Sequence, residues 1–372
     1  MSAKGPIESP SRAQIERMAL TANRAPSAEN CQPWHFRWDG QALTIEHDPE
    51  RARHALNHRD DVSRLALGGV LEALSIAARA EGWSAEPALS LHGPARSIWA
   101  TVRFSPAAPA TPADRALLPA VEARATDRRI YRGGSLSHPV FAEIQRDAAR
   151  FPGAGLHLLD RFSPALVRFI VAADASIWRD DAAYRDVTRW VRFSQKELDE
   201  AGDGVPFASA GVYLPESQIF RLAKLSFARG LAERLGLLPL ARLWVERQLK
   251  SSAGLLMITV RDPSREAMIE AGRLAFSMWI RLNRNGFGVH PMTIQALPVY
   301  HAATADLRPG TPPSDIGLFR DARPLLERAF GYPQGELPVW MFRTGLSSPP
   351  PPSQRTRRLP LTRIFSSEAP AR

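Results

Sequence analysis

The sequence predicts an α+β fold made of two comparable halves. Segments with helical periodicity alternate with short strand-like segments on both sides of a Pro/Ala-rich stretch at 105–113. Two long helical segments carry small or apolar side chains on most turns, which is typical of helices buried at the centre of a fold. We therefore expect a first half at 11–104, a linker at 105–113, a second half at 114–345 and a basic extension at 346–372.

The first half begins with a predicted helix and a β-hairpin. Apolar side chains recur at helical spacing from Ser11 to Ala22. Asp39-Gly40 is a dipeptide typical of two-residue hairpin turns, and it separates two strand-like runs. The elements expected next are strands at 34–38 and 43–47, a long helix capped by Asp60 or Asp61 and ended by Gly82, and a strand at 97–104.

The second half is expected to be richer in helix. Asp262 is placed as an N-cap with Pro263 at the first helical position, and Asn285-Gly286 ends that helix. We expect Gly202–Pro215 to form an irregular loop able to act as a lid, and Phe287–Thr293 to form a second loop. The other expected elements are helices at 114–123, 139–150, most of 163–200 and 315–330, and strands at 156–159, 255–260 and 337–343.

Composition excludes several classes of protein. The net charge is +10, but the chain has only four lysines, and acidic residues are interspersed among the arginines, so we expect no nucleic-acid partner. No apolar run approaches the roughly 20 residues needed to cross a bilayer, and no secretory signal is recognisable, so we expect no membrane partner and a cytoplasmic location. Cys31 is the sole cysteine, which rules out an intramolecular disulfide.

The segment 25–34, here called the signature loop, has the composition of a ligand-binding loop. Pro26 and Pro33 fix the backbone and remove two N–H donors. Between them, Ser27, Asn30 and Gln32 carry short hydrogen-bonding groups on a stiff frame. Such preorganisation suits a polar, planar ligand.

Two arginine-rich segments are candidates for anion binding. Arg124, Thr126 and Arg128 follow a predicted helix, and two guanidiniums with a hydroxyl can orient a dianion. The second segment, 355–358, contains Arg355 and Arg357 and is interpreted either as a solvated tail or as a phosphate clamp.

Two other groups of residues raise the question of a reactive cysteine or a metal site. Cys31 has His35 nearby in sequence, but a single cysteine and histidine do not make a catalytic set, so we expect a structural cysteine. Histidines and aspartates between 47 and 61 match no metal-binding spacing, so we expect no metal site; they are His47, Asp48, His54, His58, Asp60 and Asp61.

These motifs resemble those of the nitroreductase family of flavin enzymes. The signature loop matches the pattern A-P-S-x-x-N-x-Q-P-W at every fixed position, and the segment at 124–128 is similar to the family's R-x-[S/T]-x-[K/R]. Gly286-x-Gly288 followed by Pro291, Met292 and Thr293 resembles the loop that lies against the reactive edge of the flavin. The resemblance implies an FMN cofactor contacted by Pro26, Ser27, Asn30, Arg124, Thr126, Arg128, Pro291, Met292, Thr293, Arg355 and Arg357.

The order of the motifs departs from that of ordinary homodimeric nitroreductases. There the basic segment precedes the P-S-x-x-N loop, and each flavin lies between two subunits. Here the loop comes first and occurs once. The chain thus resembles the fused-dimer, Acg-like branch, in which two degenerate nitroreductase-like halves share one chain. This resemblance implies a monomer with an internal pseudo-dimer and a single FMN between the halves.

The resemblance implies an FMN-dependent oxidoreductase that transfers hydride from NAD(P)H to a small oxidised acceptor, such as a nitroaromatic or a quinone. The flavin would carry the chemistry, so no catalytic side chain is expected. The alternative is a flavin-sequestering protein in which a lid covers the ring and little turnover occurs. The two functions share every phosphate contact and differ in access to the ring.

Overall fold

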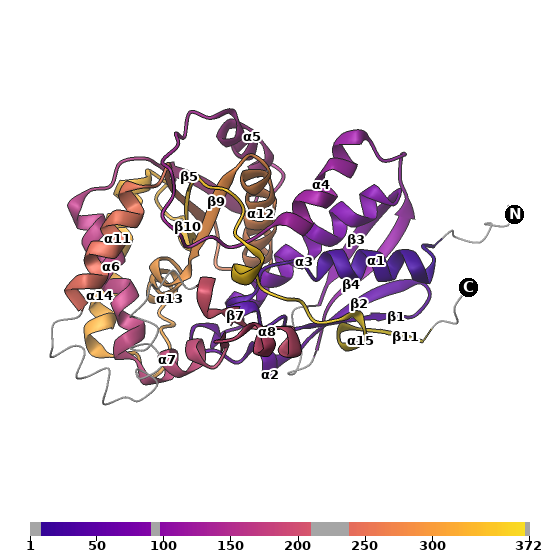
Figure 1. The fold of residues 1–372 in the computed structure, drawn as a ribbon, viewed down its shortest axis with the longest axis horizontal. Helices are drawn as coiled ribbons and strands as arrows, with labels where there is room; N and C mark the ends of the chain where they lie inside the picture. The colour runs from indigo at the N-terminus through magenta and orange to yellow at the C-terminus, as the bar shows by residue number, and fades with distance from the viewer. Residues whose placement is uncertain (1–8, 91–96, 210–237, 369–372) are drawn as a thin grey trace, which may run out of the picture.

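The structure is a computed structural model that describes residues 9–90, 97–209 and 238–368. It is an α+β fold, as predicted, with two main sheets separated by a central pair of helices (Figure 1). Among the described residues, none of the helices is both long enough and apolar enough to cross a bilayer.

The first sheet is built almost entirely from the N-terminal part of the chain. Neighbouring strands in the order β1-β2-β4-β3 are antiparallel, and β11 from the C-terminus adds to the edge parallel to β1. The predicted hairpin is confirmed, since Trp38 pairs with Leu43 across the Asp39-Gly40 turn. The strands are β1 (Trp34–Trp38), β2 (Ala42–His47), β3 (Trp83–Leu89), β4 (Ile98–Pro106) and β11 (Phe365–Ser367).

The second sheet repeats the topology of the first. Its strands are β5 (Ala154–Leu159), β8 (Gly254–Val260), β9 (Phe287–Met292) and β10 (Leu337–Leu346), in the antiparallel order β5-β8-β10-β9. In each sheet the fourth strand lies between the second and the third, and a long helix connects the second strand to the third. This shared order is the arrangement expected of two related halves in one chain.

The two connecting helices, α3 (Asp61–Ala80) and α12 (Arg265–Arg284), pack against each other at the centre of the molecule (Figure 1). Glycines allow this contact: a Cβ on Gly68 would lie 2.1 Å from the Ile269 carbonyl oxygen. A Cβ on Gly272 would lie 2.0 Å from the Leu65 carbonyl oxygen. The clashes are reciprocal, because Ile269 precedes Gly272 by three residues and Leu65 precedes Gly68 by three. A two-fold interface has this property.

The other helices surround the two sheets. Ser11 caps α1 in a capping box, and Thr111 caps α4 in the same way. Figure 1 shows α6, α11 and α14 gathered on the side of the second sheet that faces away from the first. The remaining described elements are α1 (Arg12–Ala22), α2 (Pro49–Ala52), α4 (Pro112–Ala123), α5 (Pro139–Ala148), α6 (Pro164–Arg179), α7 (Asp181–Thr188), α8 (Gln195–Ala201), α11 (Leu238–Lys250), α13 (Leu297–Ala303), α14 (Pro313–Phe330), α15 (Leu361–Ile364), the short strands β6 (Val191–Arg192) and β7 (Val205–Pro206), and single 3₁₀ turns.

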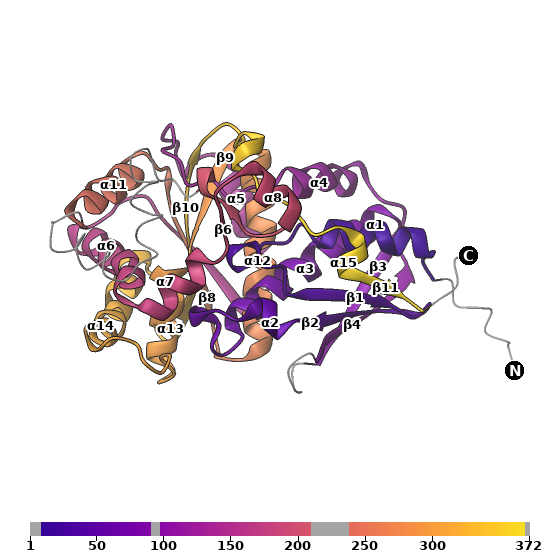
Figure 2. The same cartoon turned by 60° about the horizontal axis from the view of Figure 1, so that its bottom comes forward.

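The C-terminal extension crosses from the second sheet back to the first (Figure 2). Leu359, Ile364 and Phe365 are buried in the apolar core of the first half. Gln32 of the signature loop joins this segment to two others, and its side chain is fully buried. Its amide donates to the carbonyls of Asn30 (3.2 Å) and Gly202 (3.0 Å), and its carbonyl accepts from Leu359 N (2.8 Å).

The predicted loop at Phe287–Thr293 is wrong. Residues 287–292 form β9, which pairs along its length with β10, and only Thr293–Gln295 leaves the strand as a 3₁₀ turn. Glycine and proline misled the prediction because β9 is an edge strand of the described sheet. At an edge, Pro291 costs no ladder hydrogen bond.

Two predicted helix caps are also wrong. Ser264, not Asp262, caps α12, and the Asp262 carboxylate instead accepts from Ser264 N. Asp60 precedes α3 with a left-handed φ of 62° and makes no side-chain cap. Of the predicted loop Gly202–Pro215, residues 202–209 contain β7 and a 3₁₀ turn, and the rest lies outside the described residues.

Replacing Gly68 by alanine should destabilise the protein, because the new methyl group would collide with the Ile269 backbone. We expect a loss of about 1–3 kcal/mol in the free energy of unfolding, the usual cost of overpacking a core. Gly317 of α14 is the matched control, since a Cβ there meets nothing within 4 Å. Gly317→Ala should stabilise by up to about 1 kcal/mol through helix propensity. Chemical denaturation measures both, and equal effects would contradict close packing at Gly68.

Gln32→Glu should also destabilise the protein, although the shape of the side chain is kept. A carboxylate can still accept from Leu359 N, but it cannot donate to the carbonyls of Asn30 and Gly202. Each buried carbonyl left unpaired costs about 1–3 kcal/mol. Gln41→Glu, at the exposed hairpin turn, should change stability by no more than about 0.5 kcal/mol. A thermal or urea unfolding midpoint that is unchanged in Gln32→Glu would contradict this role.

Candidate functional site

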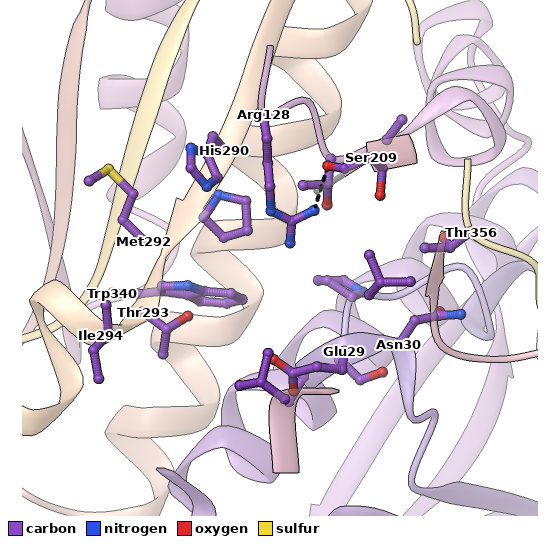
Figure 3. A pocket seen from close by; sticks show the side chains of 18 of the residues that line it. Glu29, Asn30, Arg128, Ser209, His290, Met292, Thr293, Ile294, Trp340 and Thr356 are labelled. Atoms are coloured by element: carbon purple, nitrogen blue, oxygen red, sulfur yellow. Dashed lines mark hydrogen bonds between the residues drawn. The ribbon is translucent and has the colours of Figure 1, made fainter. Parts of the chain in front are cut away.

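A cavity of about 430 Å³ lies between the two halves. Its walls come from the signature loop, α3, the segment 124–128, β9 with the turn after it, and the C-terminal extension. Figure 3 shows Met292, Thr293, Ile294 and Trp340 on one side, Asn30 and Thr356 on the other, and Arg128 reaching between them. All eleven residues predicted for the site line it: Pro26, Ser27, Asn30, Arg124, Thr126, Arg128, Pro291, Met292, Thr293, Arg355 and Arg357.

The signature loop is held in an unusual backbone conformation. Glu29, Asn30 and Gln32 have φ values of 42°, 59° and 50°, in the left-handed region that side chains other than glycine seldom adopt. The Ser27 hydroxyl accepts from Gln32 N at 2.9 Å and supports this turn. Gln32 is not among the residues that line the cavity, because its three hydrogen bonds go to the protein.

Asn30 links the loop to the rest of the site. Its amide nitrogen donates to the carbonyls of Gly204 (3.1 Å) and Arg357 (2.8 Å). Its amide oxygen is buried and has no hydrogen-bond partner among the described residues. A buried acceptor left in this state is costly, so Asn30 presents an acceptor for a ligand donor.

Four arginines, here called the guanidinium cluster, gather at one part of the cavity: Arg24, Arg124, Arg355 and Arg358. The Arg24 carbonyl accepts from both Arg124 (3.1 Å) and Arg358 (3.0 Å), and Arg355 donates to the Ala123 carbonyl. Among the described residues only one carboxylate pairs with the cluster, since Glu122 lies 3.2 Å from Arg24.

This excess of positive charge shows in the pKa values. Burial, with Arg24 and Arg355 nearby, lowers the pKa of Arg124 to about 9. Burial and the neighbouring Arg124 and Arg24 also hold the pKa of Arg358 well below its usual value. A buried cation with a lowered pKa lacks a counter-charge, so the cluster is suited to bind an anion.

The other two predicted arginines differ in how free they are. Arg128 makes one long hydrogen bond, to the Ser209 carbonyl at 3.4 Å, and burial lowers its pKa (Figure 3). Arg357 instead forms an ion pair with Asp199 at 2.7 Å, and its side chain is 36% exposed. The charge of Arg357 is therefore balanced within the protein, whereas that of Arg128 is available to a ligand.

The wall formed by β9 and β10 presents further unpartnered groups. His290 Nδ1, Trp340 Nε1 and Arg343 Nε line the cavity, are buried, and have no hydrogen-bond partner among the described residues. Gln295 Oε1, in the turn after β9, is in the same state. A cavity that gathers orphaned donors and acceptors is built for a ligand with several polar atoms.

Sequence reasoning missed several of these residues. Arg24 directly precedes the signature loop and Arg358 ends the basic run, so adjacency to a motif was the available signal. His290 and Gln295 adjoin the motif at 286–293, so the same signal was available for them. Asp174 and Trp340 carried no such signal, because only the fold brings α6 and β10 to this cavity.

Cys31 and the histidines make no second site. Burial raises the pKa of the Cys31 thiol to about 12, so the reactive thiolate is disfavoured. His54 Nε2 lies 3.3 Å from Glu29 Oε2, His47 stacks on Trp99, and His58 bonds the Asp306 carbonyl. In the described parts of the chain no three His, Cys, Asp or Glu groups converge as metal ligands.

Comparison with known proteins identifies similar sequences. No protein-family model matches the chain. The chain is 24% identical over 282 residues to "Probable NAD(P)H nitroreductase PigM" of Serratia sp., covering 73% of this chain and 78% of that protein. It is 30% identical over 184 residues to the uncharacterized protein Rv3127 of Mycobacterium tuberculosis, covering 47% of this chain and 52% of that one.

Comparison of folds gives weaker matches. A putative nitroreductase from Anabaena variabilis aligns with a TM-score of 0.45 and 9% identity, covering 92% of this chain and 90% of that one. A nitroreductase with bound FMN from Desulfitobacterium hafniense aligns with a TM-score of 0.36 and 10% identity, covering 67% and 96%. The chain is thus similar in sequence to a probable NAD(P)H nitroreductase over about three quarters of its length, and the residues of its nitroreductase-like motifs line one cavity.

Proposed function

We propose that the cavity binds one FMN and that the protein is an FMN-dependent oxidoreductase. It would take hydride from NAD(P)H and reduce a small oxidised acceptor, such as a nitroaromatic or a quinone. The observation that carries this proposal is the guanidinium cluster, whose four arginines have a single carboxylate partner among the described residues, at one part of a cavity lined by every predicted motif. The name of the similar PigM protein, a probable NAD(P)H nitroreductase, agrees with it.

The phosphate end of FMN fits the guanidinium cluster. A phosphate monoester carries nearly two negative charges, and guanidinium groups bind its oxygens through paired N–H donors. Arg124 is buried and Arg358 is half-buried, and both already use N–H groups on the Arg24 carbonyl, which fixes their positions. Thr126 and Thr356 add hydroxyl groups to the same wall.

The flavin ring fits the rest of the cavity by its mixture of donors and acceptors. Its carbonyl oxygens and ring nitrogens need partners, and three residues that line the cavity, Asn30, Trp340 and Arg343, each carry a buried polar atom without a hydrogen-bond partner among the described residues. Pro291, Met292 and Thr293 lie on the side where the family resemblance expects the reactive edge. Bound there, FMN would supply the hydride chemistry, and the protein would supply position and electrostatics.

The protein's own groups would act by binding and by excluding water. Leu65, Ala66 and Trp279 place apolar surface beside the polar groups, which strengthens the electrostatic interactions of the site. Arg128 forms no ion pair with a described residue, and it is placed to stabilise negative charge on a reduced ring.

The alternative is a protein that stores flavin with little turnover. It is favoured by the contact of residues 205–209 with the cavity: Val205 and Ser209 line it, and the Ser209 carbonyl accepts from Arg128. These two residues belong to the loop predicted to act as a lid. The two functions differ in whether nicotinamide reaches the ring, so the half-reaction with NAD(P)H distinguishes them.

Arg124→Ala should weaken FMN binding by roughly 1.5–3 kcal/mol, or about 10- to 150-fold in Kd, the range for a charged hydrogen bond. Arg357→Ala is the comparison, since Arg357 is paired with Asp199 and half-exposed. It should weaken binding less. Fluorescence quenching of FMN titrated with each protein measures Kd, with circular dichroism to check folding. Equal losses in both variants, or none in Arg124→Ala, would contradict the assigned phosphate site.

NADPH or NADH added without oxygen should bleach the visible absorption of the FMN-loaded protein, and a quinone or nitroaromatic should restore it. The physical reason is that an open cavity lets nicotinamide approach the ring. Stopped-flow absorbance in an anaerobic cell records both steps. Persistent yellow colour with both nucleotides would support flavin storage instead. If the protein binds no FMN, both the oxidoreductase function and the flavin-storage function are contradicted.

A further inference from the structure

Asp174 is an acidic side chain that the proposed function does not use. It lies on α6 and lines the cavity. Its Oδ1 accepts a hydrogen bond from Gln295 Nε2 at 2.5 Å, and the Gln295 oxygen has no partner among the described residues. Gln295 follows Thr293 by two residues, so the carboxyl group is fixed next to the wall assigned to the reactive edge of the flavin.

The surroundings of Asp174 are otherwise apolar. Leu56, Ile177, Val187, Val245, Leu249 and Ile294 line this part of the cavity from five different elements. Such a wall suits a small, flat, uncharged acceptor, because it offers apolar contact and one polar pair for orientation. Nitroaromatics and quinones have this character, with oxygen at the atoms that are reduced.

Charged groups lie on the cavity wall and on the helices packed against α6. Glu29, His54, Arg128, His290 and Arg343 line the same cavity. On the packed helices, Asp315 of α14 pairs with Arg179, and Asp186 of α7 accepts from Ala55 N. The third packed helix, α11, carries Glu246, Arg247 and Lys250. Among the described groups none shifts the pKa of Asp174 through its charge.

Burial raises the pKa of Asp174 to about 6, and the hydrogen bond from Gln295 lowers it. The carboxyl group is therefore neutral below about pH 6, where a free aspartate is already ionised. A neutral carboxyl is a hydrogen-bond donor, and its proton can be transferred.

We infer that Asp174, positioned by Gln295, is the proton donor to the oxygen of the electron acceptor. The inference rests on the proposed function. Reduction of a quinone to its hydroquinone takes one hydride and one proton, and so does reduction of a nitro group to a nitroso group with loss of water. The acceptor gains two electrons with the hydride, and the bound cofactor is oxidised. The O–H bond of Asp174 breaks as a new O–H bond forms on the acceptor, and solvent returns the proton to the carboxylate.

The test compares Asp174→Asn with wild type and with Asp160→Asn, an exposed aspartate just before α6. Each protein is loaded with FMN, reduced with NADPH and mixed with 1,4-benzoquinone or with ferricyanide, which accepts electrons without protons. For each protein we divide the rate with benzoquinone by the rate with ferricyanide. We expect this ratio to be about 10²-fold lower in Asp174→Asn than in wild type, which is the lower end of the range for general acid catalysis, and to be unchanged in Asp160→Asn. The wild-type ratio should fall as pH rises through about 6, and Asp174→Asn should lose this dependence.

A second measurement needs no flavin. Infrared spectra of the flavin-free protein should show the carbonyl band of a protonated carboxyl group that disappears near pH 6 and is absent in Asp174→Asn. Gln295→Ala should move this loss, and the pH profile of the benzoquinone ratio, to higher pH, because it removes the bond that lowers the pKa. If Gln295 had only a structural role, its replacement would change neither the pH at which the infrared band is lost nor the pH profile of the benzoquinone ratio.

The outcomes separate the two proposals. If the wild-type protein binds no FMN, or if NADPH does not reduce it, the proposed function and the proton role both fail. If reduction proceeds normally but Asp174→Asn keeps the benzoquinone ratio and its pH profile, the proton role alone is overturned. An absent infrared band, or one unmoved in Gln295→Ala, overturns it too.

Discussion

The close crossing of α3 and α12 at Gly68 and Gly272 is the constraint on which the rest of the structure depends. Each glycine lets the partner helix approach until backbone meets backbone, and a side chain at either position would force the two halves apart. The signature loop packs on α3, since a Cβ on Gly69 of this helix would lie 3.2 Å from Pro26. Arg124 stacks on Trp279 of α12, 4.8 Å from the ring centre. The distance between the two ligand-binding segments is thus set by the helix crossing.

The same crossing explains why we propose one cofactor rather than two. When the sequence of α3 is aligned with that of α12 so that Gly68 matches Gly272, two residues that line the cavity, Val62 and Ala66, correspond to Glu266 and Glu270. The Glu270 carboxylate accepts from Gly153 N, so protein backbone occupies part of the equivalent space. Two acidic side chains there would repel a phosphate. The repeated topology would offer two sites by symmetry, and the acidic residues of α12 are the reason we propose an anion at only one of them.

Local patterns predicted most of the helices, the hairpin and the residues of the site, because propensity and motif chemistry act over a few residues. Apart from the two helix caps, the errors occurred where a distant segment decides the outcome. Residues 287–292 are a strand because β10 pairs with them, and β11 adds to the first sheet because Leu359 and Ile364 are buried in its core. The ion pair of Arg357 with Asp199 is a further contact between distant segments, and Arg357 stays a predicted phosphate ligand. None of these three pairings is visible within a short window of sequence.

The site carries a free-energy cost that a ligand would relieve. Buried Arg124 and half-buried Arg358 lie beside other cations. In the signature loop, Glu29, Asn30 and Gln32 hold left-handed backbone angles. Such strain and repulsion persist only where the surrounding structure enforces them. Gln32 enforces the loop through three hydrogen bonds, and the helix crossing holds the arginines near it. An anion bound at the cluster would remove the repulsion without moving either element, so affinity would come from charge placed in advance rather than from rearrangement.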